Sequence, residues 1–251
     1  MFIVAIHDWQ QGDASVIRKV ADAMGCLVFE VQQRMAGEGP VVVAQYADGD
    51  IAESLQEKLM QADVPAILLD LDEVRSGPSP LIPRRFSFSS QHVRFDMDGG
   101  TPFELAFTEI RHILVATTVT TPEEKGEKTT ERKFSLGKTV LAGGVPMTKK
   151  VVRQSAGVAE EREEVVCLVN RNAPSVFLPK NGLDYSGLGE AKQLTRDLNF
   201  NYLKKELRSR AGQAIYDDRL LQRAAQVRLL GTRLDPDTHL DLAFKILELS
   251  L

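Results

Sequence analysis

Apolar residues in the first 72 positions form short continuous runs that alternate with amphipathic stretches. Three runs rich in aliphatic residues, at residues 2–6, 40–44 and 66–71, predict buried strands. Apolar residues spaced three and four apart predict two helices after the first run and one after the second. Gly25 and Gly37 follow the first two helices, as glycine commonly does at a helix C-terminus. The order β-α-α-β-α-β predicts one sheet with helices on one face, in a split β-α-β, ferredoxin-like arrangement.

Part of this pattern is shared with a known family. The shared residues are Val16 to Val20, the Met24-Gly25 turn, Glu30, and Ala52, Leu55, Leu59 and Ala62 in the third helix. In them, residues 2–72 resemble the C-terminal domain of the bacterial ribosomal stalk protein, and this resemblance implies a fold. The lysines with which that family recruits translation factors are replaced here by Phe29 and Gln32, and its second glycine by Leu27. The resemblance therefore implies the shape of the family and not a ribosomal role.

The pattern changes after residues 75–80 (RSGPSP), whose prolines, glycine and serines predict a linker. Beyond the linker, apolar and polar residues alternate, which predicts strands. The predicted strands are residues 85–89, 93–97, 103–107, 113–118, 149–154, 165–170 and 175–178. Asp98-Gly99-Gly100 suits a hairpin turn between two of them. Residues 122–133 carry charges of both signs and no apolar side chain, which predicts a mobile loop, and residues 155–164 predict a second loop.

Helical spacing returns near Leu194 and predicts helices over residues 194–212, 217–230 and 237–249. Seven strands followed by one helix is the outline of a pleckstrin-homology-like sandwich. The segment from Phe103 to Ile113 is similar to the strand and short turn of bacterial members of that superfamily. Residues 82–212 therefore resemble a bacterial pleckstrin-homology-like domain, although an unrelated small barrel fits the same pattern.

These patterns predict an α+β chain in three parts. Residues 1–74 form the stalk-like α/β module, residues 82–212 form an antiparallel β-rich module with its helix, and residues 213–251 form a helical tail. The last predicted helix has one broad apolar face, which either packs on this chain or associates with a partner. We favour packing within the chain, because ordered chain ends are usually docked.

Composition narrows the class of protein. At 43% hydrophobic and 26% charged residues, the 251-residue chain is an ordinary globular protein without an apolar run of about 20 residues. Its net charge of −4 argues against a nucleic-acid partner, since such proteins usually carry a basic surface. Cys26 and Cys167 lie far apart and outside any metal-ligand spacing. Together with the missing secretory signal, this spacing predicts a reduced, cytoplasmic protein.

Two groups of polar residues follow predicted strands. His7 and Asp8 stand where a general base or metal ligand is often found, but no second ligand is near in sequence. Asp70, Asp72 and Glu73 offer fewer carboxylates than sites for hard cations usually use. A solvated turn or loop is the favoured interpretation of both groups.

Other candidate groups also have a structural interpretation. Gly143-Gly144 lacks the Lys-Ser/Thr ending of a phosphate loop and predicts a turn. The apolar run around Cys167 predicts an inert core thiol. Two basic clusters suit an anionic partner such as a lipid head group, but solvated surfaces are favoured. They are residues 149–153, with Lys149, Lys150 and Arg153, and residues 204–210, with Lys204, Lys205, Arg208 and Arg210.

The sequence therefore assigns no catalytic, cofactor-binding or metal-ligating residue. Together with the missing cofactor motifs, this favours a non-enzymatic protein that acts through protein–protein contact or as a scaffold. The alternative is an enzyme or small-ligand binder whose site lies between the two modules. The sequence does not identify the partner or the ligand.

Overall fold

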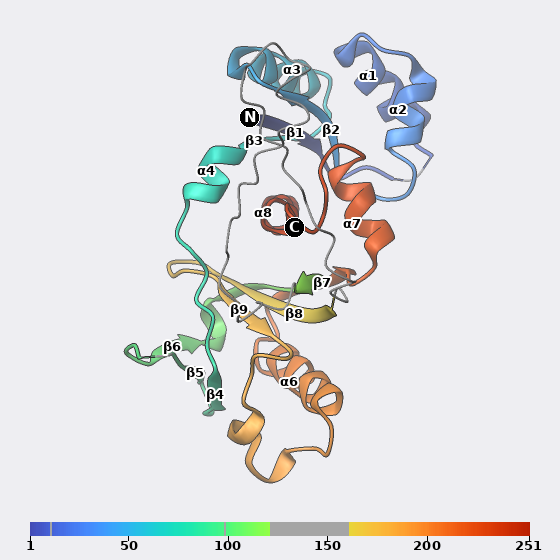
Figure 1. The fold of residues 1–251 in the computed structure, drawn as a ribbon. Coiled ribbons are helices and arrows are strands. Elements are labelled where there is room, and N and C mark those ends of the chain that lie inside the picture. Colours follow the sequence, from blue (N-terminus) through green and yellow to red (C-terminus); the bar gives the residue numbers. More distant parts are fainter. Residues whose placement is uncertain (11, 98, 121–160) are drawn as a thin grey trace, which may run out of the picture. The chain divides into compact units, whose positions relative to one another are not determined.

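The structure is a computed structural model that describes residues 1–10, 12–97, 99–120 and 161–251. Residue contacts divide the chain into one unit of residues 1–118 and 163–251 and another of residues 119–162. The packing described below is that of the first unit. Its mixture of helices and small sheets confirms the α+β class (Figure 1). The predictions for the loop at 122–133, the strand at 149–154, the Gly143-Gly144 turn and the basic cluster at 149–153 fall outside the described residues.

The N-terminal segment contains the predicted order of strands and helices. Its elements are β1 (Phe2–Ile6), α1 (Ala14–Met24), α2 (Val28–Arg34), β2 (Val41–Tyr46), α3 (Gly49–Gln61) and β3 (Ala66–Asp70). The strands form one sheet in the order β2-β1-β3, with β1 antiparallel to both neighbours. The Asp13 carboxylate accepts from the backbone N–H groups of Ser15 and Val16 and so caps α1. Gly25 ends this helix at φ 64°, a left-handed conformation that suits glycine.

The predicted end of the third strand at residue 71 and the predicted start of the linker at residue 75 are wrong in detail. A short helix, α4 (Leu71–Ser76), occupies the end of the predicted strand and the start of the predicted linker. The Asp70 carboxylate accepts from the backbone N–H of Asp72 at 2.9 Å and begins this helix. The prolines at 78 and 80 follow it in a stretch without regular structure.

The predicted strands that fall on described residues are present. One antiparallel sheet consists of β4 (Arg85–Phe88), β5 (His92–Asp96) and β6 (Phe103–Ala106). A second sheet has the order β10-β7-β8-β9, with β7 (Ile110–Thr120), β8 (Glu161–Asn170), β9 (Val176–Pro179) and β10 (Ile215–Leu220). Residues 161–164 belong to β8, so the second predicted loop, 155–164, is wrong over these positions.

Short 3₁₀ helices lie at Phe107–Glu109 and Tyr185–Ala191, and α6 (Arg196–Arg210) follows the second of them. The prediction of a helix over residues 194–212 is confirmed. The Thr195 hydroxyl accepts from the backbone N–H of Leu198 at 3.2 Å and caps α6.

The helix predicted over residues 217–230 is wrong in its first half. Ile215–Leu220 is a strand that pairs in parallel with β7, and only Arg223–Leu230 is helical (α7). β10 lies within residues 213–251, so the segment predicted as a helical tail also contains a strand. Leu220 is fully buried beside β7, and Asp217 is held by an ion pair with Arg219 at 2.7 Å. Pairing with a distant strand outweighs the local helical spacing here.

β1 is apolar on both faces, and both faces are buried. Successive side chains of a strand point to opposite sides of the sheet. Val4 and Ile6 belong to a cluster with buried residues of α1, α2 and α3. Ile3 and Ala5 belong to another cluster, which includes buried residues of α7 and of the last helix, α8 (Leu240–Ser250). Helices therefore cover both faces of the first sheet, and not one face as predicted (Figure 1).

The C-terminal helix packs within the chain, as favoured from the sequence. Its buried residues are Leu240, Leu242, Ala243, Phe244, Ile246 and Leu247. They share a cluster with Leu69 of β3, Leu114 of β7 and Val165 of β8. This cluster joins residues from all three predicted segments, and the boundaries at 74 and 213 stay predictions. Within the described ranges, no helix has the length and apolar composition needed to cross a membrane.

Replacing Leu247 with alanine should lower the free energy of unfolding by about 2–5 kcal/mol, because the fully buried side chain leaves a cavity. Leu249→Ala is the matched control on the same helix. Leu249 is 46% exposed, so its loss should cost about 0.5 kcal/mol or less. Urea unfolding followed by circular dichroism measures both values. Equal losses for the two variants would contradict the docking of α8.

Residues 1–74 should fold as an isolated fragment, because the helix-covered cluster lies entirely between Val4 and Ala66. The fragment should also bind the dye anilinonaphthalene sulfonate more strongly than the full chain. Its other sheet face, with Ile3, Ala5 and Leu69, loses the cover of α7 and α8. Circular dichroism reports folding and dye fluorescence reports the exposed face. An unfolded fragment would place the boundary elsewhere.

Candidate functional site

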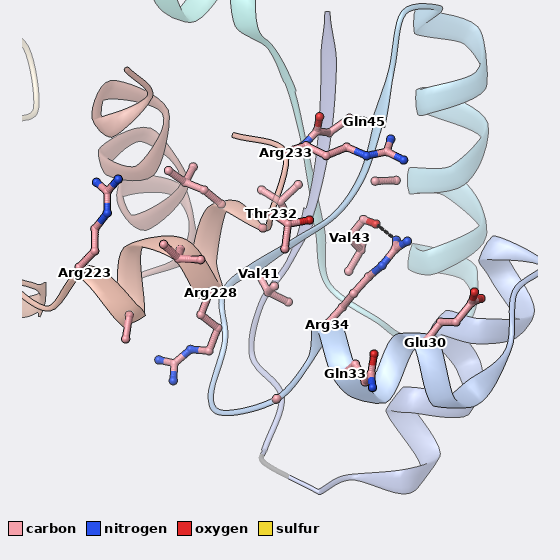
Figure 2. A pocket seen from close by; sticks show the side chains of 17 residues that line it. Glu30, Gln33, Arg34, Val41, Val43, Gln45, Arg223, Arg228, Thr232 and Arg233 are labelled. Atoms are coloured by element: carbon pink, nitrogen blue, oxygen red, sulfur yellow. Dashed lines mark hydrogen bonds between the residues drawn. The ribbon is translucent and has the colours of Figure 1, made fainter. Parts of the chain in front are cut away.

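A groove of about 930 Å³ runs along the outer edge of β2, between α2 and α7 (Figure 2). β2 is an edge strand in the sheet order β2-β1-β3, so on one side it has no neighbouring strand among the described residues. Such an edge carries backbone N–H and C=O groups that can pair with another extended segment. The lining residues are Glu30, Gln33, Arg34, Ala36, residues 41–45, residues 223–224, Val227, Arg228 and residues 230–233.

β2 contains a β-bulge at Val43, which is one of the residues that line this groove. In the register of the first sheet, Val4 pairs with Ala44 and Ala5 pairs with Val42, so Val43 has no partner. A bulge residue of this kind leaves part of its backbone outside the ladder. The Arg34 guanidinium donates from Nη1 to the Val43 carbonyl oxygen at 2.5 Å, as the dashed line in Figure 2 shows. Arg34 thereby satisfies one exposed carbonyl and holds α2 against the strand edge.

The groove carries an excess of positive charge. Arg34, Arg223, Arg228 and Arg233 line it, and Glu30 is the acidic residue among its described lining residues. Arg223 is held by the carboxylates of Asp235 and Asp237. Arg228 and Arg233 are exposed and make no hydrogen bond or ion pair with the residues that the structure describes. Two guanidinium groups are therefore free to bind an anionic group.

Gly37 explains how Arg228 reaches the groove. This glycine has φ 107°, a conformation that side chains rarely adopt, and it lies directly beside the Arg228 side chain. A Cβ atom at position 37 would come within 2.5 Å of Arg228 Nη1. The absence of a side chain at Gly37 leaves the space that the guanidinium occupies.

An apolar patch lies at the start of α2, next to the groove wall. Leu27, Val28 and Phe29 are 69%, 46% and 64% exposed. Phe29 precedes Gln33 by one helical turn, so the patch and the groove wall share one side of the helix. Contiguous exposed apolar side chains are typical of protein-binding surfaces.

A second groove, of about 710 Å³, lies among α4, β3, β8, β9 and α8. Its walls come from residues of the predicted modules 1–74 and 82–212 and from the predicted tail. Phe177 and Phe244 pack edge to face in it, with ring centroids 5.5 Å apart. Its charged lining residues are Asp70, Glu73, Asp241, Lys245 and Glu248. The two grooves therefore carry opposite charge.

Cys167 lines the second groove as a neutral thiol. Burial, together with the nearby Glu248 carboxylate, raises the pKa of Cys167 to about 12. A thiol that stays protonated at neutral pH is a poor nucleophile. The prediction of an inert core thiol is thus supported.

None of the histidines belongs to a group of three or more potential metal ligands within the described residues. His7 Nδ1 lies 2.9 Å from the Asp8 carboxylate on an exposed turn. His112 is a buried residue of β7, where burial lowers its pKa and its Nδ1 has no partner in the described part of the chain. No group of three or more His, Cys, Asp or Glu residues that could hold a metal ion occurs among the described residues.

Asp70, Asp72 and Glu73 have different surroundings. Asp70 caps α4, Asp72 is exposed at the first turn of that helix, and Glu73 lies on the second groove. The solvated loop expected here is instead a short capped helix.

Most of the basic cluster at 204–210 is already paired. Lys204 binds the Glu164 carboxylate at 2.6 Å, and Arg210 binds Glu206 at 2.8 Å. The Arg208 guanidinium lies over the ring of Tyr216, 4.7 Å from its centroid. These contacts leave little free charge for an anionic ligand on α6, which supports the interpretation of a solvated surface.

Sequence reasoning missed the arginine groove. Arg34 and Arg228 lie on helices that are far apart in the chain, and no spacing rule connects them. The nearest signal is the recurrence of arginine at 223, 228 and 233. The first two fall within the helix predicted over residues 217–230, and Arg233 lies beyond it.

No protein-family model, curated protein or solved structure matches this chain. The likeness of residues 2–72 to the stalk domain and of residues 82–212 to a pleckstrin-homology-like domain therefore stays a prediction. The functional proposals below rest on the geometry of the two grooves.

Iodoacetamide at about pH 8 should alkylate Cys26 in the native protein and leave Cys167 intact, because the thiolate is the reactive form. Cys26 is half-buried, whereas Cys167 is 5% exposed with its pKa near 12. Mass spectrometry of the modified peptides measures both sites, and urea-unfolded protein should react at both.

The same pKa has a consequence for stability. In the unfolded state the Cys167 thiol should lose its proton near its ordinary pKa of 9.0, whereas the folded state keeps it protonated to higher pH. The free energy of unfolding should therefore fall as the pH rises through 9.0. Cys167→Ala should show a smaller fall over this range.

In the iodoacetamide experiment, fast alkylation of Cys167 in a Cys26→Ser variant would contradict the burial of the Cys167 thiol.

Proposed function

We propose that this protein is a non-enzymatic interaction protein that binds an extended, acidic segment of a partner protein along the β2 edge. The observation that carries the proposal is the pair of free guanidinium groups, Arg228 and Arg233, beside an open strand edge. An extended segment laid along a sheet edge gains main-chain hydrogen bonds. Carboxylates on alternate side chains of that segment would meet the arginines.

Arginine suits this role better than a diffuse basic surface. Its planar guanidinium donates two parallel hydrogen bonds to one carboxylate and loses little entropy per bond formed. Arg34 already occupies the Val43 carbonyl, so the incoming segment would align beside it rather than replace it. The apolar patch Leu27-Val28-Phe29 offers a further contact for an apolar residue of the partner.

A protein partner is favoured over nucleic acid. The net charge of the chain is −4, and the free arginines form a local site rather than a basic stripe. The cytoplasmic setting predicted from the cysteines belongs to the same proposal. Cys26 and Cys167 are both free thiols, which supports a reducing compartment.

The finer fold assignments also belong to this proposal. The element order from β1 to β3 supports a stalk-like, ferredoxin-like module. Phe29 and Gln32 are both exposed on α2, where the family pattern would place lysines, so this module would act through other contacts. The strands β4 to β9 followed by α6 support a pleckstrin-homology-like module.

The test uses two fluorescein-labelled peptides of equal length, one alternating glutamate with valine and the other lysine with valine. Fluorescence anisotropy with the full chain should show binding of the acidic peptide alone. The double variant Arg228→Glu/Arg233→Glu should weaken that binding by about tenfold or more. Each exposed ion pair contributes up to about 1 kcal/mol, and the reversed charges add repulsion.

Arg18→Glu/Arg171→Glu is the matched control, because it makes the same change in net charge at exposed positions outside the groove. Its affinity for the acidic peptide should equal that of the unmodified protein. Equal binding of the two peptides, or an unchanged affinity in the groove variant, would refute the proposal. Tighter binding of a single-stranded oligonucleotide would favour a nucleic-acid partner instead.

A further inference from the structure

The second groove has the size and lining of a small-molecule site. Its volume of about 710 Å³ falls within the range of ligand pockets, about 300–1,000 Å³. Leu69, Val169, Phe177 and Phe244 line it with apolar surface, and all but Phe177 are less than a tenth exposed. An apolar ligand body would displace water from these walls, which favours binding.

The charge of this groove is negative. Four carboxylates line it, those of Asp70, Glu73, Asp241 and Glu248, against the single ammonium group of Lys245. Lys245 is already paired with Glu248 at 3.0 Å, and Asp70 caps α4. The remaining acidic residues are therefore the ones available to a ligand.

Glu73 and Asp241 are those two residues. Both are exposed while lining the groove, which places them at its rim. Neither carboxylate makes a hydrogen bond or ion pair with the residues that the structure describes. A cationic group at the rim would gain charge complementarity there while its apolar part enters the groove.

A buried polar group supports the same site. Asn170 lines the groove and is 9% exposed. Its Nδ2 donates to the Pro174 carbonyl at 2.8 Å, which fixes the orientation of the amide. Its Oδ1 then remains an acceptor without a partner among the described residues. Buried acceptors are usually satisfied, so a donor on a ligand or a bound water is expected at this position.

We propose that this groove binds an amphipathic organic cation, a small molecule with an apolar body and one ammonium group. Phe177 and Phe244 add aromatic faces that attract cations. This site is separate from the β2 groove, so the proposal does not depend on the partner-binding function.

Decylammonium is the probe, because its ammonium N–H groups can also donate to the Asn170 Oδ1. Decyl sulfate, with the same chain and the opposite charge, is its counterpart. Both are titrated into the full chain by calorimetry below the concentration at which they aggregate. We expect one molecule of the cation to bind per chain, and the anion to bind at least about tenfold more weakly. The cation should also raise the melting temperature, since a ligand that binds the folded state stabilises it.

The double variant Glu73→Gln/Asp241→Asn should weaken binding of the cation by about tenfold, because both removed charges face the ammonium group. Asp22→Asn/Glu57→Gln removes two exposed charges outside the groove and should leave the affinity unchanged. Methylammonium, which has the same head group and lacks the chain, should bind far more weakly than the probe.

Three results would overturn the proposal. They are equal affinities for the cation and the anion, an unchanged affinity in the Glu73→Gln/Asp241→Asn variant, or a cation that lowers the melting temperature. None of them bears on the acidic-peptide test, which changes residues of the other groove.

Discussion

The burial of both faces of the small β2-β1-β3 sheet is the constraint on which the rest of the structure depends. When a strand is apolar at every position, exposing either of its faces to water costs free energy. Val4 and Ile6 are covered by the helices that follow in sequence, but Ile3 and Ala5 are covered by α7 and α8. α7 and α8, which lie late in the described chain, therefore pack on the first sheet and complete its core.

This return also creates the two grooves. α7 covers the sheet next to the β2 edge and supplies Arg228 to the first groove. α8 packs among β3, β8 and β9 and supplies Asp241 and Phe244 to the second. Each C-terminal helix thus buries one side against the sheet and offers another to a cleft. The buried core and the two grooves have the same origin, because the helices that exclude water from the core also form the groove walls.

Elements with strong local signals could be predicted, and those that depend on distant partners could not. The run at Phe2–Ile6 is continuously apolar, which is typical of a strand buried on both faces, and it is β1. The segment Ile215–Leu220 carries two aspartates and an arginine, and only its parallel partner β7 makes it a strand. The sequence placed α8 within three residues of its start but could not show which sheet it would cover.

The candidate sites were beyond sequence reasoning for the same reason. A site becomes visible in sequence when its residues are close in the chain or follow a known spacing. Arg34 and Arg228 meet only because α2 and α7 flank one strand edge, and Glu73 and Asp241 because α4 and α8 flank one cleft. The second groove is lined by residues of both predicted modules, and a ligand site there stays a proposal.

The packing of α8 against β1 has a consequence for synthesis of the chain. During translation, β1 leaves the ribosome long before the residues of α8 have been joined. Until then Ile3, Ala5 and Leu69 present an uncovered apolar face on an otherwise formed sheet. Such a surface on a nascent chain attracts chaperones and promotes aggregation. Slow synthesis of the middle of the chain should prolong this vulnerable state, and the arrival of the last helix should end it.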